Sequence, residues 1–289
     1  GRNNKKWLPH LLGHEASGVV SDIGPGVKKV KKGDEVILSW IKSKGIDSEP
    51  IKFFHKKRKI NAGKVTTFSN FSIVSENRIT RKPKNISLKN SVFLGCAFST
   101  GMGMILKEID TTKNMNVVLI GLGGIGLGAL IALKYRKIKN IVVIDNNKKK
   151  KDLAKRFGVK DFFSSIDNVT LRRINKKFKK GVDLCIESAG DIKTIEYGLK
   201  LINNSGRIHF ASHPNNKLKL KIDPHELILG KKITGSWGGS VNPDIDFKKF
   251  SMILKKMKFN SNIISSKVYN LENINSAIKE FKVKKILDQ

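Results

Sequence analysis

A glycine-rich segment in the middle of the chain has the spacing needed to bind phosphate groups. Gly121–Gly126 has the pattern G-x-G-x-x-G and follows the apolar residues 114–120. Its first glycine permits a tight turn, its second lets a pyrophosphate approach the backbone, and its third lets the next helix pack closely. A glycine turn without a ligand is the alternative, but strand, loop and helix together favour a dinucleotide site. The residues expected to contact this dinucleotide are Gly121, Gly123, Gly124, Ile125 and Gly126.

An acidic residue after the next apolar stretch indicates which of the two nicotinamide dinucleotides binds. Asp145 follows residues 140–144 and lies at the spacing after Gly121 that the fingerprint requires. A carboxylate there accepts hydrogen bonds from ribose hydroxyls and repels a 2′-phosphate, which predicts NAD rather than NADP. The basic run Lys148–Lys151 weakens this discrimination and contains Lys150, another residue that we expect to bind the cofactor. The alternative role of Asp145 is to cap the following helix.

Alternating strands and helices from about residue 114 onward would position these residues. Strands are predicted at 114–120, 140–145, 161–165, 181–190, 206–212 and 232–238, and helices at 125–137, 147–158 and 192–202. This order is typical of an α/β fold with a doubly wound parallel sheet and right-handed crossovers.

The two ends of the chain have a different pattern. Residues 1–95 contain short strand-like stretches bounded by glycines, with a polar and basic surface excursion at 41–62. Amphipathic helices are predicted at 246–258 and 273–282. We therefore expect a nucleotide-binding domain at 96–239, inserted into a second domain that is formed by 1–95 and 240–289.

Composition excludes several classes of protein. The net charge is +33, but lysine greatly outnumbers arginine and the lysines are spread along the chain, which favours solvated surfaces over a nucleic-acid interface. Two cysteines, Cys96 and Cys185, exclude a disulfide framework and fit a reducing cytoplasm. The absence of a long uninterrupted apolar run argues against a membrane span.

A second group of reactive side chains lies near the start of the chain. His14 and Glu15 belong to Gly13–Gly18, which is followed by Gly24 and Val27. This spacing resembles the zinc-type signature of the medium-chain alcohol dehydrogenases, G-H-E-x-x-G-x5-G-x-x-V. The likeness continues through residues 63–80, which look like the class III branch, and covers nearly the whole chain. It implies a nucleotide-binding (Rossmann) domain inserted into a mostly-β, GroES-like catalytic domain.

The resemblance also implies roles for individual residues. Residues 94–103 are similar to the family segment with a zinc-ligand cysteine, so His14 and Cys96 correspond to zinc ligands and Glu15 to a nearby or exchangeable ligand. The remaining correspondences are Thr100 near the nicotinamide, Trp40 in the substrate pocket, Lys284 at the pyrophosphate, and Phe210 and Ala211 beside the nicotinamide. Core packing for Trp40 and a solvated position for Lys284 are the alternatives.

Two departures from the family pattern limit these expectations. The family's remaining zinc-ligand cysteine and its proton-relay hydroxyl lie upstream of the His-Glu motif, whereas this sequence begins with Gly1 only a few residues before it. We therefore expect an N-terminally truncated chain with one incomplete catalytic zinc site, which as given can lack both zinc and activity. Residues 41–62 contain none of the four cysteines of the family's structural zinc lobe, so no structural zinc is expected.

Together, the residues and the resemblance predict a zinc-dependent oxidoreductase that transfers hydride from an alcohol or polyol to NAD. A metal-free, catalytically silent NAD-binding relative and a basic nucleic-acid-binding protein are the alternatives. The expected partners are a small alcohol or aldehyde and further copies of the chain in a dimer or tetramer, with neither nucleic acid nor membrane. The expected location is the cytoplasm.

Overall fold

The computed structural model describes residues 8–214, 217–264 and 267–287, with side chains up to residue 280. The chain divides into two compact units. One unit comprises the residues up to Ser99 together with Val241–Leu287, and the other comprises Thr100–Ser240. No helix among the described residues is long and apolar enough to cross a membrane.

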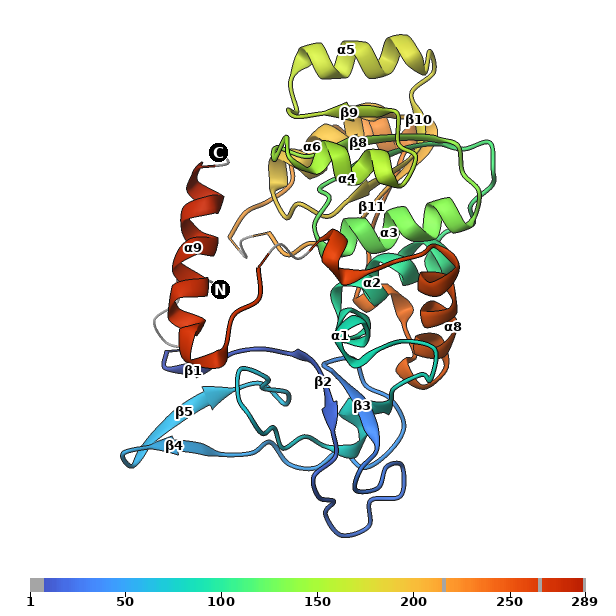
Figure 1. The fold of residues 1–289 in the computed structure, drawn as a ribbon. Coiled ribbons are helices and arrows are strands. Elements are labelled where there is room, and N and C mark those ends of the chain that lie inside the picture. The colour runs from blue at the N-terminus through green and yellow to red at the C-terminus, as the bar shows by residue number, and fades with distance from the viewer. Residues whose placement is uncertain (1–7, 215–216, 265–266, 288–289) are drawn as a thin grey trace. The chain divides into compact units, whose positions relative to one another are not determined.

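Six parallel strands form the central sheet of the unit Thr100–Ser240 (Figure 1). Their order is β12-β11-β10-β7-β8-β9, and each neighbouring pair is parallel. The strands are β7 (Asn116–Ile120), β8 (Asn140–Ile144), β9 (Asp161–Phe163), β10 (Val182–Glu187), β11 (Ile202–Phe210) and β12 (Lys232–Gly235). The predicted doubly wound parallel sheet is confirmed.

Both faces of this sheet are covered, which explains why its strands are almost entirely apolar. One face packs against α5 (Asn168–Lys177) and α6 (Ile192–Leu201), with Val118 and Ile120 of β7 in that cluster. Their neighbours Val117 and Leu119 point to the opposite face because side chains alternate along a strand, and both are fully buried. The helix α3 (Gly124–Tyr135) contacts β7 and β10.

The order of the strands defines where a ligand would bind in this unit. The chain starts the sheet at β7 and adds β8 and β9 on one side, then crosses to add β10, β11 and β12 on the other. The crevice at the carboxyl ends of β7 and β10 is therefore the point where the winding reverses, which is the ligand site of open α/β sheets. The glycine segment follows β7 at this point.

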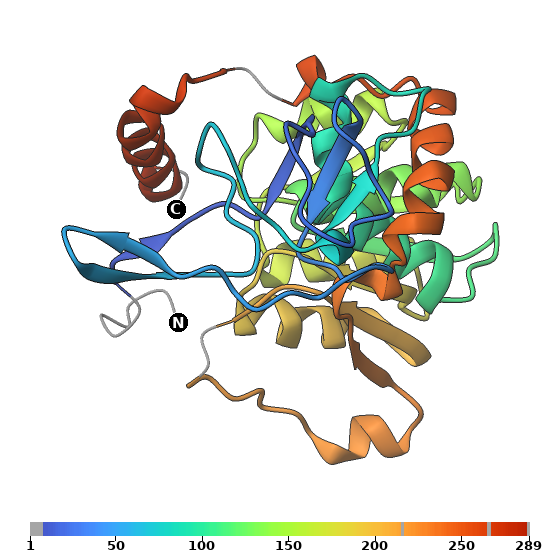
Figure 2. The same cartoon turned by 90° about the horizontal axis from the view of Figure 1, so that it is seen from below.

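The described residues of the other unit form two small sheets. The antiparallel sheet β2-β3-β6 joins β2 (Glu15–Val19), β3 (Glu35–Ser39) and β6 (Ile79–Arg81). The sheet β1-β5-β4 joins β1 (His10–Leu11), β5 (Arg58–Ala62) and β4 (Phe53–His55). The hairpin of β4 and β5 extends away from the β2-β3-β6 sheet in two views (Figures 1 and 2). The predicted surface excursion at 41–62 thus contains two short strands.

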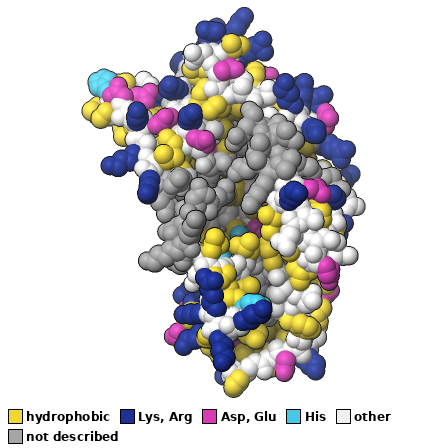
Figure 3. All heavy atoms as spheres, turned by 90° about the vertical axis from the view of Figure 1, so that its left-hand side faces the viewer, with side chains coloured by type: hydrophobic (Ala, Val, Ile, Leu, Met, Phe, Trp, Pro, Cys, Tyr) yellow, Lys and Arg dark blue, Asp and Glu magenta, His cyan; other side chains and the backbone are white. Residues whose placement is uncertain are grey.

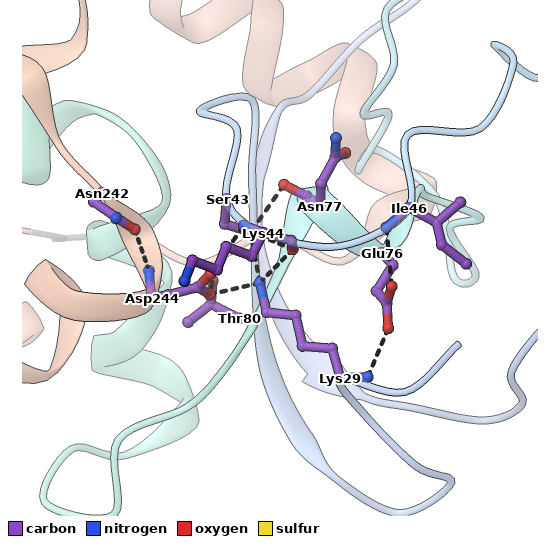
Figure 4. A network of polar contacts seen from close by, with 9 residues as sticks. All are labelled: Lys29, Ser43, Lys44, Ile46, Glu76, Asn77, Thr80, Asn242 and Asp244. Carbon is purple, nitrogen blue, oxygen red and sulfur yellow. Dashed lines mark hydrogen bonds and ion pairs between the residues drawn. The ribbon is translucent and has the colours of Figure 1, made fainter. Parts of the chain in front are cut away.

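A polar network fixes the loop after β3 in the same unit (Figure 4). The Glu76 carboxylate accepts hydrogen bonds from the backbone N–H groups of Lys28 (2.7 Å), Lys29 (2.6 Å) and Ile46 (2.9 Å). Asp244 accepts the N–H of Lys44 at 3.0 Å and forms an ion pair with the Lys29 ammonium at 2.5 Å. Both carboxylates satisfy backbone donors that would otherwise lack partners, so they hold the loop in one conformation.

The remaining helical elements are mostly short. The α-helices are α1 (Leu88–Ser91), α2 (Ala97–Gly103), α4 (Lys150–Arg156), α7 (Pro224–Ile228), α8 (Pro243–Lys256) and α9 (Ile274–Leu287). The 3-10 helices are η2 (Glu76–Arg78), η3 (Val92–Gly95), η5 (Gly238–Ser240), η6 (Ser261–Ile263) and η7 (Leu271–Asn273), and η4 (Met104–Glu108) is a π-helix. On the face drawn in Figure 3, Lys and Arg side chains occur in several separate groups.

Candidate functional site

Three side chains with metal-binding atoms converge in the unit that contains the β2-β3-β6 sheet. One ligand atom each from His14, Glu15 and Cys96 lies within 4.8 Å of the other two. His14 immediately precedes β2, Glu15 begins that strand, and Cys96 lies between η3 and α2. The fold therefore brings together residues that are 81 positions apart in the sequence, as the family resemblance implies for a zinc site.

Two glycines allow these segments to approach each other. Gly13 has a φ of +88°, and a Cβ at this position would lie 2.8 Å from the backbone nitrogen of Phe68. A Cβ on Gly95 would lie 2.8 Å from the carbonyl oxygen of Leu38 and 3.3 Å from the Cβ of Glu15. Real Cβ atoms do not tolerate such contacts, so the glycines before His14 and Cys96 are needed for the close packing of the site.

The electrostatics of the three groups favour a bound cation. Burial raises the pKa of Glu15, while hydrogen bonds from the Ala97 N–H (3.3 Å) and Cys96 oppose the shift. Burial and the charge of Glu15 raise the pKa of Cys96 to about 12, although the Trp40 indole donates a hydrogen bond to its sulfur at 2.9 Å. Burial also lowers the pKa of His14. A divalent cation would compensate the thiolate and the carboxylate that burial disfavours.

The donor set fits zinc in particular. Imidazole nitrogen, thiolate sulfur and carboxylate oxygen are the three ligand types that Zn²⁺ takes in proteins, and catalytic sites combine three of them with an open position. Calcium and magnesium prefer oxygen ligands alone, which makes a site with His14 and Cys96 unsuitable for them. Among the described residues, this is the group that combines such donors at metal-binding distances.

The glycine segment has the predicted strand–loop–helix geometry. Gly121 has a φ of +87°, and a Cβ there would lie 2.9 Å from the backbone nitrogen of Ala189 after β10. A Cβ on Gly126 would lie 2.8 Å from the hydroxyl of Ser188. A Cβ on Gly123, by contrast, would meet nothing within 4 Å, so this backbone faces open space. Gly123 caps α3 without a side chain, which leaves the first N–H groups of the helix available to a ligand.

Asp145 is tied to the glycine segment. Asp145 is 6% exposed, and its carboxylate accepts the Leu122 N–H at 2.6 Å and the Asn147 N–H at 2.9 Å. The Lys150 ammonium lies 3.0 Å from the same oxygen that accepts from Leu122. Helix α4 begins at Lys150 with Lys149 as its N-cap, so the alternative role of Asp145 as a helix cap is wrong. Asp145 and Lys150 thus form a largely buried ion pair beside the glycine segment.

Comparisons with known proteins agree with this arrangement. A family model described as "Alcohol dehydrogenase GroES-like domain" matches residues 1–84, and one described as "Zinc-binding dehydrogenase" matches residues 124–256. The chain is 28% identical to "Alcohol dehydrogenase class-2 isozyme 2" of Oryctolagus cuniculus, over 94% of this chain and 80% of that protein. The chain belongs to the zinc-type medium-chain alcohol dehydrogenase family.

Solved structures share the fold of this dehydrogenase. The benzyl alcohol dehydrogenase from Acinetobacter calcoaceticus superposes with a TM-score of 0.83 at 24% identity, covering 95% of this chain and 82% of that one. An alcohol dehydrogenase zinc-binding domain protein from Burkholderia ambifaria superposes with a TM-score of 0.83 at 21% identity, over 96% and 82% of the two chains. The expected combination of a Rossmann domain and a GroES-like domain is confirmed, and the chain is an alcohol dehydrogenase-like oxidoreductase.

The remaining candidate residues are those expected near the nicotinamide and the pyrophosphate of the cofactor. Thr100 is 4% exposed in α2, and the next residue, Gly101, packs so closely on α3 that a Cβ would lie 2.7 Å from the Ala129 nitrogen. Phe210 ends β11, and the Ala211 N–H donates to the carbonyl of Glu187 at 3.4 Å. The side chain of Lys284 lies outside the described residues, although its backbone belongs to α9.

Sequence reasoning missed two contacts that only the fold reveals. Trp40, expected as a wall of the substrate pocket, directs its indole N–H at the Cys96 sulfur. Glu187, the last residue of β10, is fully buried and accepts hydrogen bonds from several neighbours. A carboxylate that ends an otherwise apolar strand beside a glycine-containing turn was the available signal for Glu187.

Proposed function

We propose that this dehydrogenase oxidises a small alcohol or polyol with zinc at His14, Cys96 and Glu15 and with NAD as the hydride acceptor. In the reverse direction it would reduce the corresponding carbonyl compound with NADH as the hydride donor. The observation that carries the proposal is the convergence of imidazole, thiol and carboxylate donors within 4.8 Å. When bound, zinc supplies Lewis acidity toward the substrate oxygen and the nicotinamide accepts the hydride.

The protein's own groups would prepare the metal side of the site. His14 and Cys96 would hold the ion by nitrogen and sulfur, and Glu15 would act as a further or exchangeable oxygen ligand. Glu15 is kept in place by the Ala97 N–H. The Trp40 indole would donate to the Cys96 sulfur, which withdraws charge from the thiolate and keeps its orientation fixed. Thr100 is proposed to lie near the nicotinamide.

The cofactor side rests on the glycine segment and on Asp145. The open backbone at Gly123 and the uncapped start of α3 would receive the pyrophosphate. Asp145 and Lys150 would bind the adenosine ribose, with the carboxylate accepting from its hydroxyls and disfavouring a 2′-phosphate. Phe210, Ala211 and Lys284 are proposed as further contacts of the cofactor.

We further propose that two copies of the chain associate through β12. This strand lies at the end of the six-stranded sheet, so one of its edges has no neighbouring strand in the described chain. Ile228, Leu229 and Trp237, which flank β12 in the sequence, are largely exposed apolar residues. Edge-to-edge pairing about a two-fold axis would satisfy the strand and cover this apolar surface. Light scattering should give a dimer or a multiple of it. Ile228→Glu should yield monomers, whereas Ile73→Glu, at a residue that is 71% exposed against 78% for Ile228, should not.

Metal analysis tests the proposed activity. The protein is loaded with zinc, dialysed and assayed for zinc content and for NADH formation from NAD with a panel of primary alcohols. The wild type should retain zinc and produce NADH, and Cys96→Ala or His14→Ala should lose both. Cys185→Ala and His55→Ala are matched controls, because Cys185 is a core residue and His55 lies on the exposed hairpin. Zinc retention by all four variants, or zinc-loaded protein without turnover, would count against the proposal.

A further inference from the structure

A glutamate with no assigned role ends the strand β10. Glu187 is 0% exposed, and it lies in register with Ile120 at the end of β7 and with Phe210 at the end of β11. Its side chain therefore sits at the carboxyl ends of the three strands that surround the reversal of the sheet. A fully buried carboxylate is costly unless its oxygens are completely hydrogen-bonded, so its presence at this point needs an explanation.

The carboxylate of Glu187 is satisfied by two separate loops. One oxygen accepts from the backbone N–H groups of Ala189 (2.8 Å) and Gly190 (3.0 Å) and from the hydroxyl of Thr194 (2.8 Å). The other oxygen accepts from the hydroxyl of Ser212. The first three donors belong to the turn after β10 and the start of α6, whereas Ser212 belongs to the loop after β11. Glu187 thus joins two loops that the strands alone do not connect.

No cation offsets the charge of Glu187 among the described ion pairs, so N–H and O–H donors compensate it. The positive end of α6, which begins at Ile192, adds to this compensation. An ion pair with a lysine or arginine would have compensated the carboxylate with less dependence on the exact positions of the partners. Hydrogen bonds stabilise the carboxylate only when their donors lie at the right distance and angle. The hydrogen bonds of Glu187 therefore fix the positions of both loops.

The two tied loops border the glycine segment. Ser188, next to Glu187, donates from its hydroxyl to the carbonyl of Gly121 at 2.8 Å. The backbone nitrogen of Ala189 lies where a side chain on Gly121 would collide. On the other side, Ala211 donates its N–H to the Glu187 carbonyl at 3.4 Å. The loop after β10 therefore abuts the proposed pyrophosphate site. The loop after β11 begins with Ala211, which together with Phe210 at the end of β11 is proposed to contact nicotinamide.

We propose that Glu187 is a positioning residue that holds the loop after β10 and the loop after β11 in the arrangement that receives the nicotinamide half of the cofactor. This inference rests on the proposed binding of NAD. The adenosine half depends on Asp145 and on the glycine segment. Hydrogen bonds from the Gly121 N–H to the Ile144 carbonyl (2.8 Å) and from the Leu122 N–H to Asp145 (2.6 Å) hold this segment without Glu187. Loss of the tie should therefore weaken binding of the nicotinamide half and leave binding of the adenosine half unchanged.

Binding of whole and partial cofactors to the purified full chain tests this proposal. Dissociation constants for NAD and for AMP are measured by calorimetry on the wild type, Glu187→Leu and Glu187→Gln. Glu187→Leu removes both acceptor oxygens and should weaken NAD binding at least about tenfold while AMP binding changes less than about twofold. Glu187→Gln keeps an acceptor for the Ala189 and Gly190 N–H groups and should retain most of the affinity for NAD. If Glu187 acted only through its charge, Glu187→Gln would weaken NAD binding as much as Glu187→Leu.

A matched variant controls for general destabilisation. Glu108→Leu removes another hydrogen-bonded carboxylate of the same unit, which contacts His209 and Ser240 rather than the two loops, and it should leave both affinities unchanged. If Glu187→Leu fails to fold, Ser212→Ala removes the tie to the loop after β11 alone and should still weaken NAD binding selectively. Equal loss of NAD and AMP binding, or no loss of either, would overturn the role of Glu187. A wild type that binds neither ligand would instead contradict the proposed use of NAD.

Discussion

Replacement of Asp145 by asparagine separates the structural role of this residue from its role in cofactor selection. The amide has nearly the shape of the carboxylate, but one of its two ends donates hydrogen bonds and cannot accept them. In the wild type, one oxygen accepts the Leu122 N–H and lies by the Lys150 ammonium, while the other accepts the Asn147 N–H. If the amide oxygen stays near Leu122, its NH₂ group must face the Asn147 N–H, which then loses the Asp145 oxygen as its acceptor.

The size of the effect follows from these contacts. An unsatisfied buried N–H costs about 1–3 kcal/mol, and the loss of the partly exposed ion pair with Lys150 adds up to about 1 kcal/mol. We expect the free energy of unfolding to fall by about 1–4 kcal/mol in urea titrations. Because Asp145→Asn removes the charge that repels a 2′-phosphate, the ratio of NADP to NAD affinity should rise at least about tenfold.

A neighbouring aspartate provides the control for this experiment. Asp152 lies in the first turn of α4 with its side chain 84% exposed, so Asp152→Asn should change neither stability nor cofactor preference. Dissociation constants for NAD and NADP are measured for all three proteins at one ionic strength, because salt screens exposed charges. A fall in stability without any change in the NADP to NAD ratio would refute the assignment of Asp145 to the ribose site and leave it a purely structural residue.

Three further predictions concern packing, pH and a buried histidine. Gly95→Ala places a Cβ 2.8 Å from a backbone carbonyl of β3 and should lower zinc retention, whereas Gly18→Ala, with no atom within 4 Å of its added Cβ, should not; metal analysis after dialysis decides. Backbone N–H donors hold the pKa of Glu76 below its usual value, so its contribution to stability is present above pH about 4.3 and is lost as the pH falls further. Glu76→Gln should therefore flatten the acid limb of stability against pH in urea titrations. His209→Phe should lower the free energy of unfolding by about 2–4 kcal/mol, because it removes the ring nitrogens that are hydrogen-bonded to Glu108 (2.8 Å) and Thr234 (2.7 Å); an unchanged value would mean that these hydrogen bonds contribute nothing.

The strands of the nucleotide-binding unit were predictable because strands that are buried on both faces appear in the sequence as continuous apolar runs. The predicted strand at 114–120 corresponds to β7, and the one at 140–145 to β8. Helix α5 was missed although Asp167 caps it and accepts the Thr170 N–H at 2.7 Å. Its sequence is dominated by charged residues, so the few apolar positions facing the sheet did not stand out as a periodic pattern.

The hairpin of β4 and β5 was missed for a different reason. Its turn uses Lys56 and Lys57 with φ angles of 45° and 62°, so it contains no glycine or asparagine to signal a tight turn. The strand pairing, rather than the local sequence, sustains these strained lysines. Regions with one solvated face and no turn residues carry little local information about their structure.

The candidate metal site shows what a motif can and cannot provide. The spacing around His14 indicated the family's zinc signature, but only the fold places Cys96 and Glu15 within reach of it. The hydrogen bond from Trp40 to the Cys96 sulfur depends on the orientation of the indole ring, which the spacing of residues in the sequence does not predict. The tie at Glu187 likewise depends on two loops that are distant in the sequence.

Isotope transfer tests the central proposal most directly. Zinc-loaded protein is incubated with NAD and a primary alcohol that is deuterated at the carbinol carbon, and the reduced cofactor is analysed by mass spectrometry. Direct hydride transfer predicts NADH that carries deuterium from the alcohol, and Cys96→Ala should yield none. Protein that binds both zinc and NAD yet forms no reduced cofactor with any alcohol of the panel, or forms it without deuterium, would contradict the account.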